Sequence, residues 1–338
     1  MVARGVDPMQ ADKKRREDAV DLAFVAYLDT FTTGYLKKNW KDWQGAESVL
    51  RKDPSSVLKD KPLPEITRSD IVAVLDRYGD RPAAGERAFA LLRKLFNWAE
   101  GRGEIERSPI GKTFPAPRSG AARDRVLSDE ELTLYWNATD AIGYPFGPMF
   151  RLLLLTGCRR AEASGLSWSE LDRQACTWSL PPARSKNGQA HIIPLNDLAI
   201  AEIDAHPLTQ TEGGEVIWPK SGYVFTTTSD RPVSGYSRAK QRLDTEIEKK
   251  AEGVLEPWRL HDVRRTVATG LQKLGVRFEV TEAILNHISG ARGGVAGVYQ
   301  RHDWKDEKQS ALDAWGRHLT SLSGNSDRVN VIELRQGA

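Results

Sequence analysis

The chain has 338 residues, of which 40% are hydrophobic, and its formal net charge is +3. This length and hydrophobic content suit two domains with a core in each and exclude a fully disordered protein. No apolar run approaches the roughly 20 residues of a membrane span, and the charged start is unlike a signal peptide, so we expect a cytoplasmic protein with no membrane partner. The two cysteines, Cys158 and Cys176, indicate neither a disulfide framework nor a metal site.

Residues 19–107 have the pattern of a small helical domain. Apolar side chains recur there at spacings of three and four residues, beginning with Val20, Phe24, Tyr27, Leu28 and Phe31. Thr67 and Asp70 form a capping box that begins a helix ending near Tyr78. Pro82 begins a further helix, which the glycines at 101 and 103 end.

The helix that begins at Pro82 has one apolar side and one basic side. Its apolar positions are Phe89, Leu92, Phe96 and Ala99, and the opposite side carries Arg87, Arg93 and Lys94. Basic clusters are most often simply solvated surface, but they are also what binding to a phosphate backbone requires. These three cations are therefore candidate contacts for a phosphate backbone.

Residues 108–125 combine Pro, Gly, Ser and Arg without an apolar period, which predicts a linker. A second domain, 126–322, and a tail, 323–338, follow. In the second domain Ser128 and Glu131 form a capping box, and an apolar helix ends at Gly157. Strands are predicted at 177–180 and 191–195, with the turn signal Asn187-Gly188 between them. Further helices are expected at 196–205, 235–249, 261–274, 279–286 and 305–320. The predicted fold class is mainly α with a small β-hairpin (α+β).

The stretch LHDVRRT, residues 260–266, is the first candidate for chemistry. His261 and Arg264 are three residues apart and share one face at a helix start, where the helix dipole also favours an anion. Arg265 follows directly and is a further candidate contact for a phosphate backbone. The alternative is a surface helix with solvated cations.

Other candidate residues are scattered along the second domain, and each also has an ordinary structural explanation. Arg159 lies three residues before Glu162, which can orient its guanidinium or form a plain surface ion pair. Lys186 stands at the hairpin tip, where lysines are mostly solvated, and it matters only if the hairpin bends over a site. His287 and Tyr299 flank a glycine-rich connection, and each can equally be a packing residue.

In chain order, these residues are an arginine with a nearby glutamate, a hairpin lysine, His-x-x-Arg, a histidine and a tyrosine. This order resembles the catalytic set of the tyrosine recombinases, the phage integrase family, over nearly the whole chain. The motifs that carry the resemblance are TGCRRAEASGL, RSKNGQ, LHDVRRT, LNHIS and GVYQRHDW. The interval of 299 − 287 = 12 residues between His287 and Tyr299 is similar to that of the prophage and genomic-island integrase branch.

The resemblance implies a site-specific recombinase that integrates or excises a prophage or genomic island through a covalent 3′-phosphotyrosine. The implied catalytic residues are Arg159, Lys186, His261, Arg264, His287 and Tyr299, with Glu162 as supporting acid. Tyr299 would be the nucleophile, His261 its proton acceptor and Lys186 the acid for the leaving 5′ oxygen. The arginines and His287 would hold the phosphate oxygens. No metal or other cofactor is implied.

The same resemblance implies the partners and the domain roles. The partners are double-stranded DNA attachment sites and, because two duplexes recombine, a homotetramer on DNA, with room for a directionality factor or DNA-bending protein. Residues 19–107 would bind the core DNA site, and 126–322 would be catalytic. Residues 1–18 resemble the connector after an arm-site-binding domain, so we expect either a fragment or a protein without arm-site binding. The segment containing Trp304, Leu312 and Trp315 would pack on a neighbouring subunit or on its own domain.

Three other functions are open at this point. The doublets His261-Asp262 and His302-Asp303 also occur in metal-dependent phosphohydrolases of the HD class, whose activity a chelator would abolish. A catalytically silent protein could use the same fold to occupy DNA sites. A type IB topoisomerase shares the chemistry without strand exchange.

Overall fold

The computed structural model describes residues 22–118, 120, 124–212, 214–228, 230–287 and 303–322. The chain divides into two compact units, Met1–Ala122 and Arg123–Ala338. The boundary falls inside 108–125, the range predicted as a linker. The predicted connector 1–18, Tyr299 and the predicted tail 323–338 lie outside the described residues.

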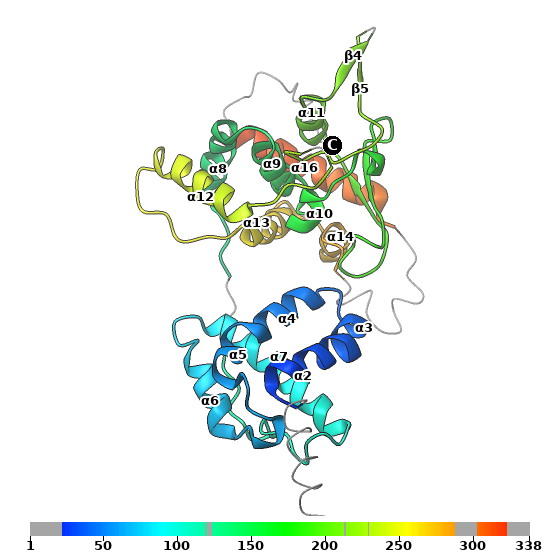
Figure 1. Cartoon of the computed structure of the whole chain (residues 1–338). Helices are drawn as coiled ribbons and strands as arrows, with labels where there is room; N and C mark the ends of the chain where they lie inside the picture. Colours follow the sequence, from blue (N-terminus) through cyan, green and yellow to red (C-terminus); the bar gives the residue numbers. More distant parts are fainter. Residues whose placement is uncertain are drawn as a thin grey trace, which may run out of the picture. The chain divides into compact units, whose positions relative to one another are not determined.

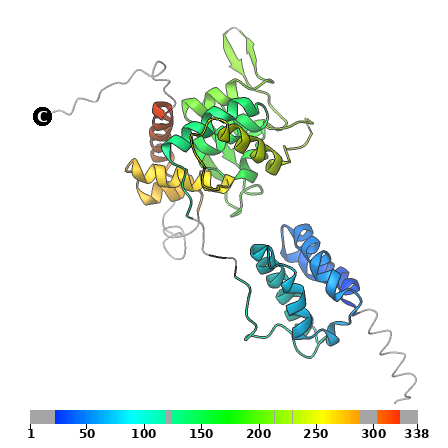
Figure 2. The ribbon, with the colours of Figure 1, turned by 90° about the vertical axis from the view of Figure 1, so that its left-hand side faces the viewer.

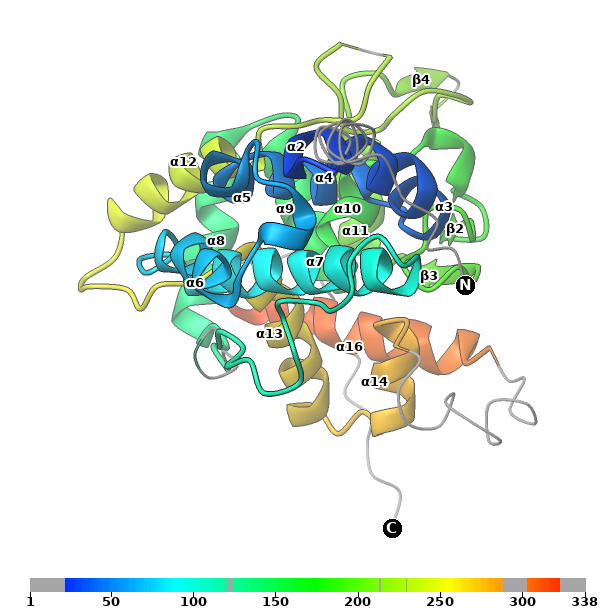
Figure 3. The same cartoon turned by 60° about the horizontal axis from the view of Figure 1, so that its bottom comes forward.

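The first unit is helical in its described part (Figure 1). Its elements are α2 (Phe24–Phe31), the π-helix η1 (Thr32–Leu36), α3 (Lys37–Asn39), α4 (Trp43–Arg51), α5 (Asp53–Leu58), the 3-10 helix η2 (Leu63–Glu65), α6 (Arg68–Asp76) and α7 (Pro82–Gly101). The capping box of Thr67 and Asp70 begins α6 as predicted. Both α4 and α6 pack on α7, the longest described helix of this unit (Figure 3).

The predicted apolar face of α7 is buried in the core of the first unit, with Phe89, Leu92, Phe96 and Ala99 all at most 5% exposed. Residues after α7 extend this core, because Ile105, Ile110 and Phe114 are also buried in it. The Phe114 ring lies 5.4 Å from that of Phe89. The first part of the predicted linker therefore packs in the first unit.

The second unit is mainly helical with short antiparallel sheets, which confirms the predicted fold class. Its helices are α8 (Asp129–Ile142), α9 (Phe146–Thr156), α10 (Arg160–Ser164), the 3-10 helix η3 (Trp168–Glu170), α11 (Asp197–Asp204), α12 (Tyr236–Glu248), α13 (Leu260–Lys273), α14 (Phe278–Ile284) and α16 (Lys305–Leu322). Its strands are β1 (Leu171–Asp172), β2 (Thr177–Leu180), β3 (His191–Pro194), β4 (Gln210–Glu212) and β5 (Glu215–Ile217). The β4–β5 hairpin, which the sequence analysis did not predict, projects from the unit (Figures 1 and 2).

Strands β1, β2 and β3 form an antiparallel sheet in that order. Trp178 pairs with Ile193 and Leu180 with His191, and all four side chains are buried. The predicted hairpin strands are therefore confirmed. The connection between them spans 181–190, so Asn187-Gly188 makes a local turn within a longer loop rather than a two-residue hairpin turn.

Helix α16 packs on its own unit, which answers one question that the sequence left open. Leu312 and Trp315 are each 1% exposed in the core of the second unit, and Trp304 packs against that core. The helix α13 approaches Trp315 through Gly270, where an added Cβ would lie 2.3 Å from the indole. In the described part of the chain, no helix is long and apolar enough to cross a membrane.

Candidate active site

The corner between α9 and α10 fixes the first arginine. Gly157 ends α9 with φ +63°, a left-handed conformation that favours glycine. Arg159 then caps α10: its backbone N–H donates to Glu162 Oε2 at 2.9 Å, and its Nη1 donates to Glu162 Oε1 at 2.9 Å. Glu162 is only 3% exposed, so the carboxylate is itself held in place. The Arg159 guanidinium therefore has a defined orientation before any ligand binds.

Arg264 is buried in the middle of the second unit, at 6% exposure. Its Nη1 donates to the Gly157 carbonyl at 2.6 Å, and its Nη2 donates to the Leu285 carbonyl. Burial, and next the positive charge of Arg159, lower the pKa of Arg264 to about 10. Two guanidiniums from separate elements are thus close enough to repel each other, which is the arrangement expected around an anion.

His261 lies in the first turn of α13, with its side chain at the surface. Partial desolvation, followed by the charges of Arg264, Arg265 and Arg159, lowers the pKa of His261. The neutral imidazole is favoured, as a proton acceptor requires. The predicted pair of His261 and Arg264 therefore lies beside Arg159.

His287 follows the end of α14. Its Nδ1 lies 2.8 Å from Glu282 Oε1, so the carboxylate orients the ring. With Nδ1–H donating to Glu282, the other nitrogen can donate to a ligand only when the imidazole is doubly protonated.

Lys186 is exposed in the β2–β3 loop, and within the described residues its ammonium makes no ion pair or hydrogen bond. Its neighbour Asn187 donates from Nδ2 to the Asn286 carbonyl at 2.7 Å. The same carbonyl accepts from Arg159 Nη2 at 3.3 Å. The loop is therefore bonded to the same carbonyl as Arg159, as a role for Lys186 at this site requires.

Tyr299 lies outside the described residues, so the structure does not place it. The site is thus described for Arg159, Glu162, Lys186, His261, Arg264 and His287.

The predicted DNA-binding residues of α7 are all exposed. The Arg87 side chain is 52% exposed, with Nη2 3.2 Å from Asp42 Oδ2, and Lys94 Nζ lies 5.9 Å from the Tyr35 ring centroid. Arg93 is exposed on the same helix. In the second unit, Arg265 is partly buried and donates to Asp262 Oδ1 at 2.7 Å.

No group of three or more His, Cys, Asp or Glu side chains in the described ranges could hold a metal ion. Asp262, from the His-Asp doublet, accepts the Arg259 backbone N–H at 2.8 Å in addition to Arg265. Its carboxylate is thus used in capping α13.

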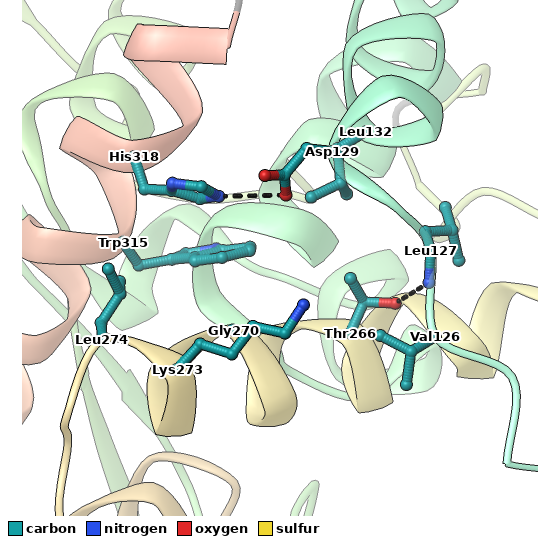
Figure 4. A pocket seen from close by; sticks show the side chains of 10 residues that line it. All are labelled: Val126, Leu127, Asp129, Leu132, Thr266, Gly270, Lys273, Leu274, Trp315 and His318. Carbon is teal, nitrogen blue, oxygen red and sulfur yellow. Dashed lines mark hydrogen bonds and ion pairs between the residues drawn. The ribbon is translucent and has the colours of Figure 1, made fainter.

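A cavity of about 60 Å³ lies apart from the arginine pair, among the start of α8, the later turns of α13 and α16 (Figure 4). His318 Nε2 lies 3.3 Å from Asp129 Oδ1 on one side of it, and Thr266 Oγ1 accepts the Leu127 N–H at 3.0 Å on another. These groups are already paired, and none of the predicted catalytic residues lines the cavity.

Several residues that assemble the site were not among those predicted to take part in it, namely Asn187, Ser185, Arg184, Glu282 and Asn286. Asn286 carried a signal, because an asparagine just after a helix often takes the left-handed conformation, and its φ is +50°. Its contacts with Asn187 and Arg159 had no local signal, because these residues are 99 and 127 positions away in the sequence.

Comparison with known proteins identifies the family. The model of the Phage integrase family matches residues 125–301, which is more than half of the chain. The chain belongs to this family. It is a tyrosine recombinase, an enzyme of site-specific DNA recombination, which confirms the resemblance recognised in the sequence.

Several relatives are similar along most of this phage integrase family member. Prophage integrase IntA of Escherichia coli K12 is 23% identical over 96% of the chain and 78% of its own length. Prophage integrase IntF of the same organism is 25% identical over 84% of the chain, and the match spans 65% of its own length. The integrase of Salmonella phage P22 is 25% identical over 92% of the chain and 71% of its own length.

Solved structures show the same fold. A lambda integrase tetramer bound to a Holliday junction matches with a TM-score of 0.64 at 19% identity, covering 85% of this chain and 83% of that one. A lambda integrase dimer bound to a core site matches with the same TM-score at 20% identity, covering 90% of this chain and 83% of that one.

Proposed function

We propose that this family member cuts and rejoins DNA at attachment sites of a prophage or genomic island through a 3′-phosphotyrosine intermediate. The observation that carries the proposal is the pair of oriented guanidiniums, Arg159 and Arg264, beside His261 and His287. Burial and the neighbouring cation Arg159 destabilise the charged form of Arg264, as its lowered pKa indicates. A scissile phosphate bound there would stabilise both guanidiniums through its negatively charged oxygens.

The chemistry requires proton transfer at both ends of the reacting phosphodiester. Tyr299 attacks phosphorus as the bond from phosphorus to the 5′ oxygen breaks. The phenol is neutral at pH 7, with a pKa of about 10, so His261 accepts its proton. Lys186 gives a proton to the departing 5′ oxygen, which leaves as a 5′ hydroxyl. The products are a 3′-phosphotyrosine and a free 5′ end, and reversal on another 5′ hydroxyl completes strand exchange.

The guanidiniums and His287 stabilise the transition state. Charge grows on the nonbridging oxygens during attack, and donors already in position stabilise it without reorganisation. Arg159 and Arg264 keep further N–H donors beyond those used for Glu162 and the backbone carbonyls, since a guanidinium has five.

The DNA partner and the assembly follow from the same proposal. Arg87, Arg93, Lys94 and Arg265 are the proposed backbone contacts, and such contacts give affinity without sequence information. The similar lambda integrase forms a tetramer on a Holliday junction. We propose a homotetramer on DNA here, with a directionality factor or DNA-bending protein as a further partner.

The test is covalent trapping on a suicide DNA substrate that carries the candidate attachment site, in the presence of chelator, resolved on a denaturing gel. We expect a protein–DNA band that is absent for Tyr299→Phe. A band that persists in this variant would refute Tyr299 as the nucleophile. DNA binding in a gel shift without any band would favour a silent DNA-binding protein, and relaxation without strand exchange would favour a topoisomerase.

A further inference from the structure

The β2–β3 loop is tied to the end of α14 by side chains on both sides of Lys186. Asn187 Nδ2 lies 2.7 Å from the Asn286 carbonyl oxygen and 3.1 Å from Asn286 Oδ1. In the other direction, Asn286 Nδ2 donates to Ser185 Oγ at 3.2 Å. The residues immediately before and after Lys186 are therefore both bonded to Asn286.

The base of the loop is held as well. Arg184 Nη2 donates to the Glu162 carbonyl at 2.5 Å, and Arg184 also pairs with Glu170. At the far end, His191 Nε2 lies 3.1 Å from the Ile284 carbonyl. The loop is thus anchored to α10, which positions Arg159, and to α14, which precedes His287.

Asn286 is suited to this role by its burial and its backbone. It is 3% exposed, and Ser185 is 2% exposed, so their hydrogen bond is shielded from water. Its φ of +50° is in the left-handed region, which asparagine adopts more readily than most other residues apart from glycine. Its carbonyl also accepts from Arg159 Nη2 at 3.3 Å. One residue therefore contacts the arginine and both neighbours of the lysine.

We infer that Asn286 and Asn187 are positioning residues that hold Lys186 at the scissile phosphate. The side chain of Lys186 is exposed and long, and the backbone on each side of it is fixed. Holding the backbone limits the volume that the ammonium searches, which raises its effective concentration at the 5′ oxygen. This inference rests on the proposed function, in which Lys186 protonates the leaving oxygen.

The test uses two DNA substrates that differ in the leaving atom. One has the natural 5′ bridging oxygen, and the other has sulfur in its place. A thiol has a reference pKa of about 8.5, so a thiolate is a much weaker base than an alkoxide. The sulfur can therefore leave as a thiolate without receiving a proton from an acid. A defect in positioning Lys186 should therefore disappear on the sulfur substrate.

Three variants and one control define the measurement, which is the single-turnover rate of covalent adduct formation. Asn187→Ala removes the donor from a partly exposed loop residue, and Asn286→Gly removes the amide but keeps the left-handed backbone and the carbonyl. Lys186→Ala removes the acid itself. Gln189→Ala changes an exposed residue of the same loop as the control.

On the oxygen substrate, we expect Asn187→Ala and Asn286→Gly to slow cleavage about 10- to 100-fold. Lys186→Ala should slow it by about 100-fold or more. On the sulfur substrate all three should return close to the wild-type rate, and Gln189→Ala should match wild type on both. Thermal denaturation checks that each variant is folded.

Equal slowing of the two asparagine variants on both substrates would overturn the inference, because the defect would then not concern the leaving group. Failure of sulfur to rescue Lys186→Ala would also overturn it, while the recombinase proposal would stand. Absence of any adduct from the wild-type chain on either substrate would instead count against the proposed function.

Discussion

Replacing Arg159 with lysine separates catalysis from DNA affinity. The substitution keeps the positive charge but replaces a planar fork with a single ammonium. In the structure Nη1 is committed to Glu162 at 2.9 Å and Nη2 to the Asn286 carbonyl at 3.3 Å, so the guanidinium plane is fixed. A lysine ammonium cannot maintain both contacts and also present donors to a phosphate in the same orientation.

The size of the effect follows from the loss of a donor that is already in position. Removal of one such donor typically costs about 2.7–4 kcal/mol of transition-state stabilisation, or a factor of about 10²–10³ in rate. DNA affinity should change little, because the charge that displaces counterions is retained. The fold should survive, because Glu162 still accepts the backbone N–H of residue 159 at 2.9 Å.

The assay compares two quantities for the same protein, the single-turnover rate of adduct formation and the dissociation constant from a gel shift. Arg160→Lys is the matched control: Arg160 is adjacent and exposed, its guanidinium lies 4.6 Å from the Tyr236 ring centroid, and the substitution keeps its charge. We expect the control to retain the wild-type rate. An adduct rate for Arg159→Lys that falls no further than the DNA affinity would refute a role for this guanidinium in the transition state.

Three further measurements test other parts of the site. The pKa of His261 is lowered, so its neutral form persists as the pH falls below the usual value of about 6.5. The fall of the cleavage rate at acidic pH should therefore have its midpoint below that value. A midpoint above it would contradict His261 as the base. Glu282→Gln should slow cleavage about tenfold or more, because the His287 ring loses the carboxylate that orients it, and unchanged kinetics would exclude that role. Gly157→Ala should lower the free energy of unfolding in urea by about 2 kcal/mol or more, from left-handed strain and from Cβ contacts at 3.1 and 3.2 Å. Gly188 has a similar φ, and an added Cβ there would meet nothing within 4 Å, so Gly188→Ala should show the cost of backbone strain alone. An equal loss of unfolding free energy in both variants would show that the Cβ contacts at residue 157 contribute nothing.

The helices and strands were largely predictable, because their signals are local. The capping boxes at Thr67 and Ser128 begin α6 and α8 as expected, and the glycine after the apolar run of α9 ends that helix. The β4–β5 hairpin was missed because its strands are mostly exposed and lack the alternation of apolar and polar residues that identifies a half-buried strand.

The local contacts of the candidate site could be predicted from the sequence, but the long-range contacts that assemble it could not. Arg159 and Glu162 share a local contact three residues apart, which the sequence displays. The contacts that bring Arg264 to Gly157 and Asn187 to Asn286 cross 107 and 99 residues, and their partners are backbone carbonyls. A carbonyl is present at every residue, so no sequence pattern marks the ones that are used.

The use of carbonyls has an electrostatic consequence for the proposed function. Arg264 donates to the carbonyls of Gly157 and Leu285, which are neutral, whereas Arg159 is paired with the carboxylate of Glu162. A second carboxylate at Arg264 would orient it equally well but would cancel its charge. Neutral acceptors orient the guanidinium and leave its full charge, which is why burial and Arg159 can lower its pKa to about 10. Binding a phosphate should therefore raise the pKa of Arg264 again, and the free energy of that relief adds to the affinity for the anion.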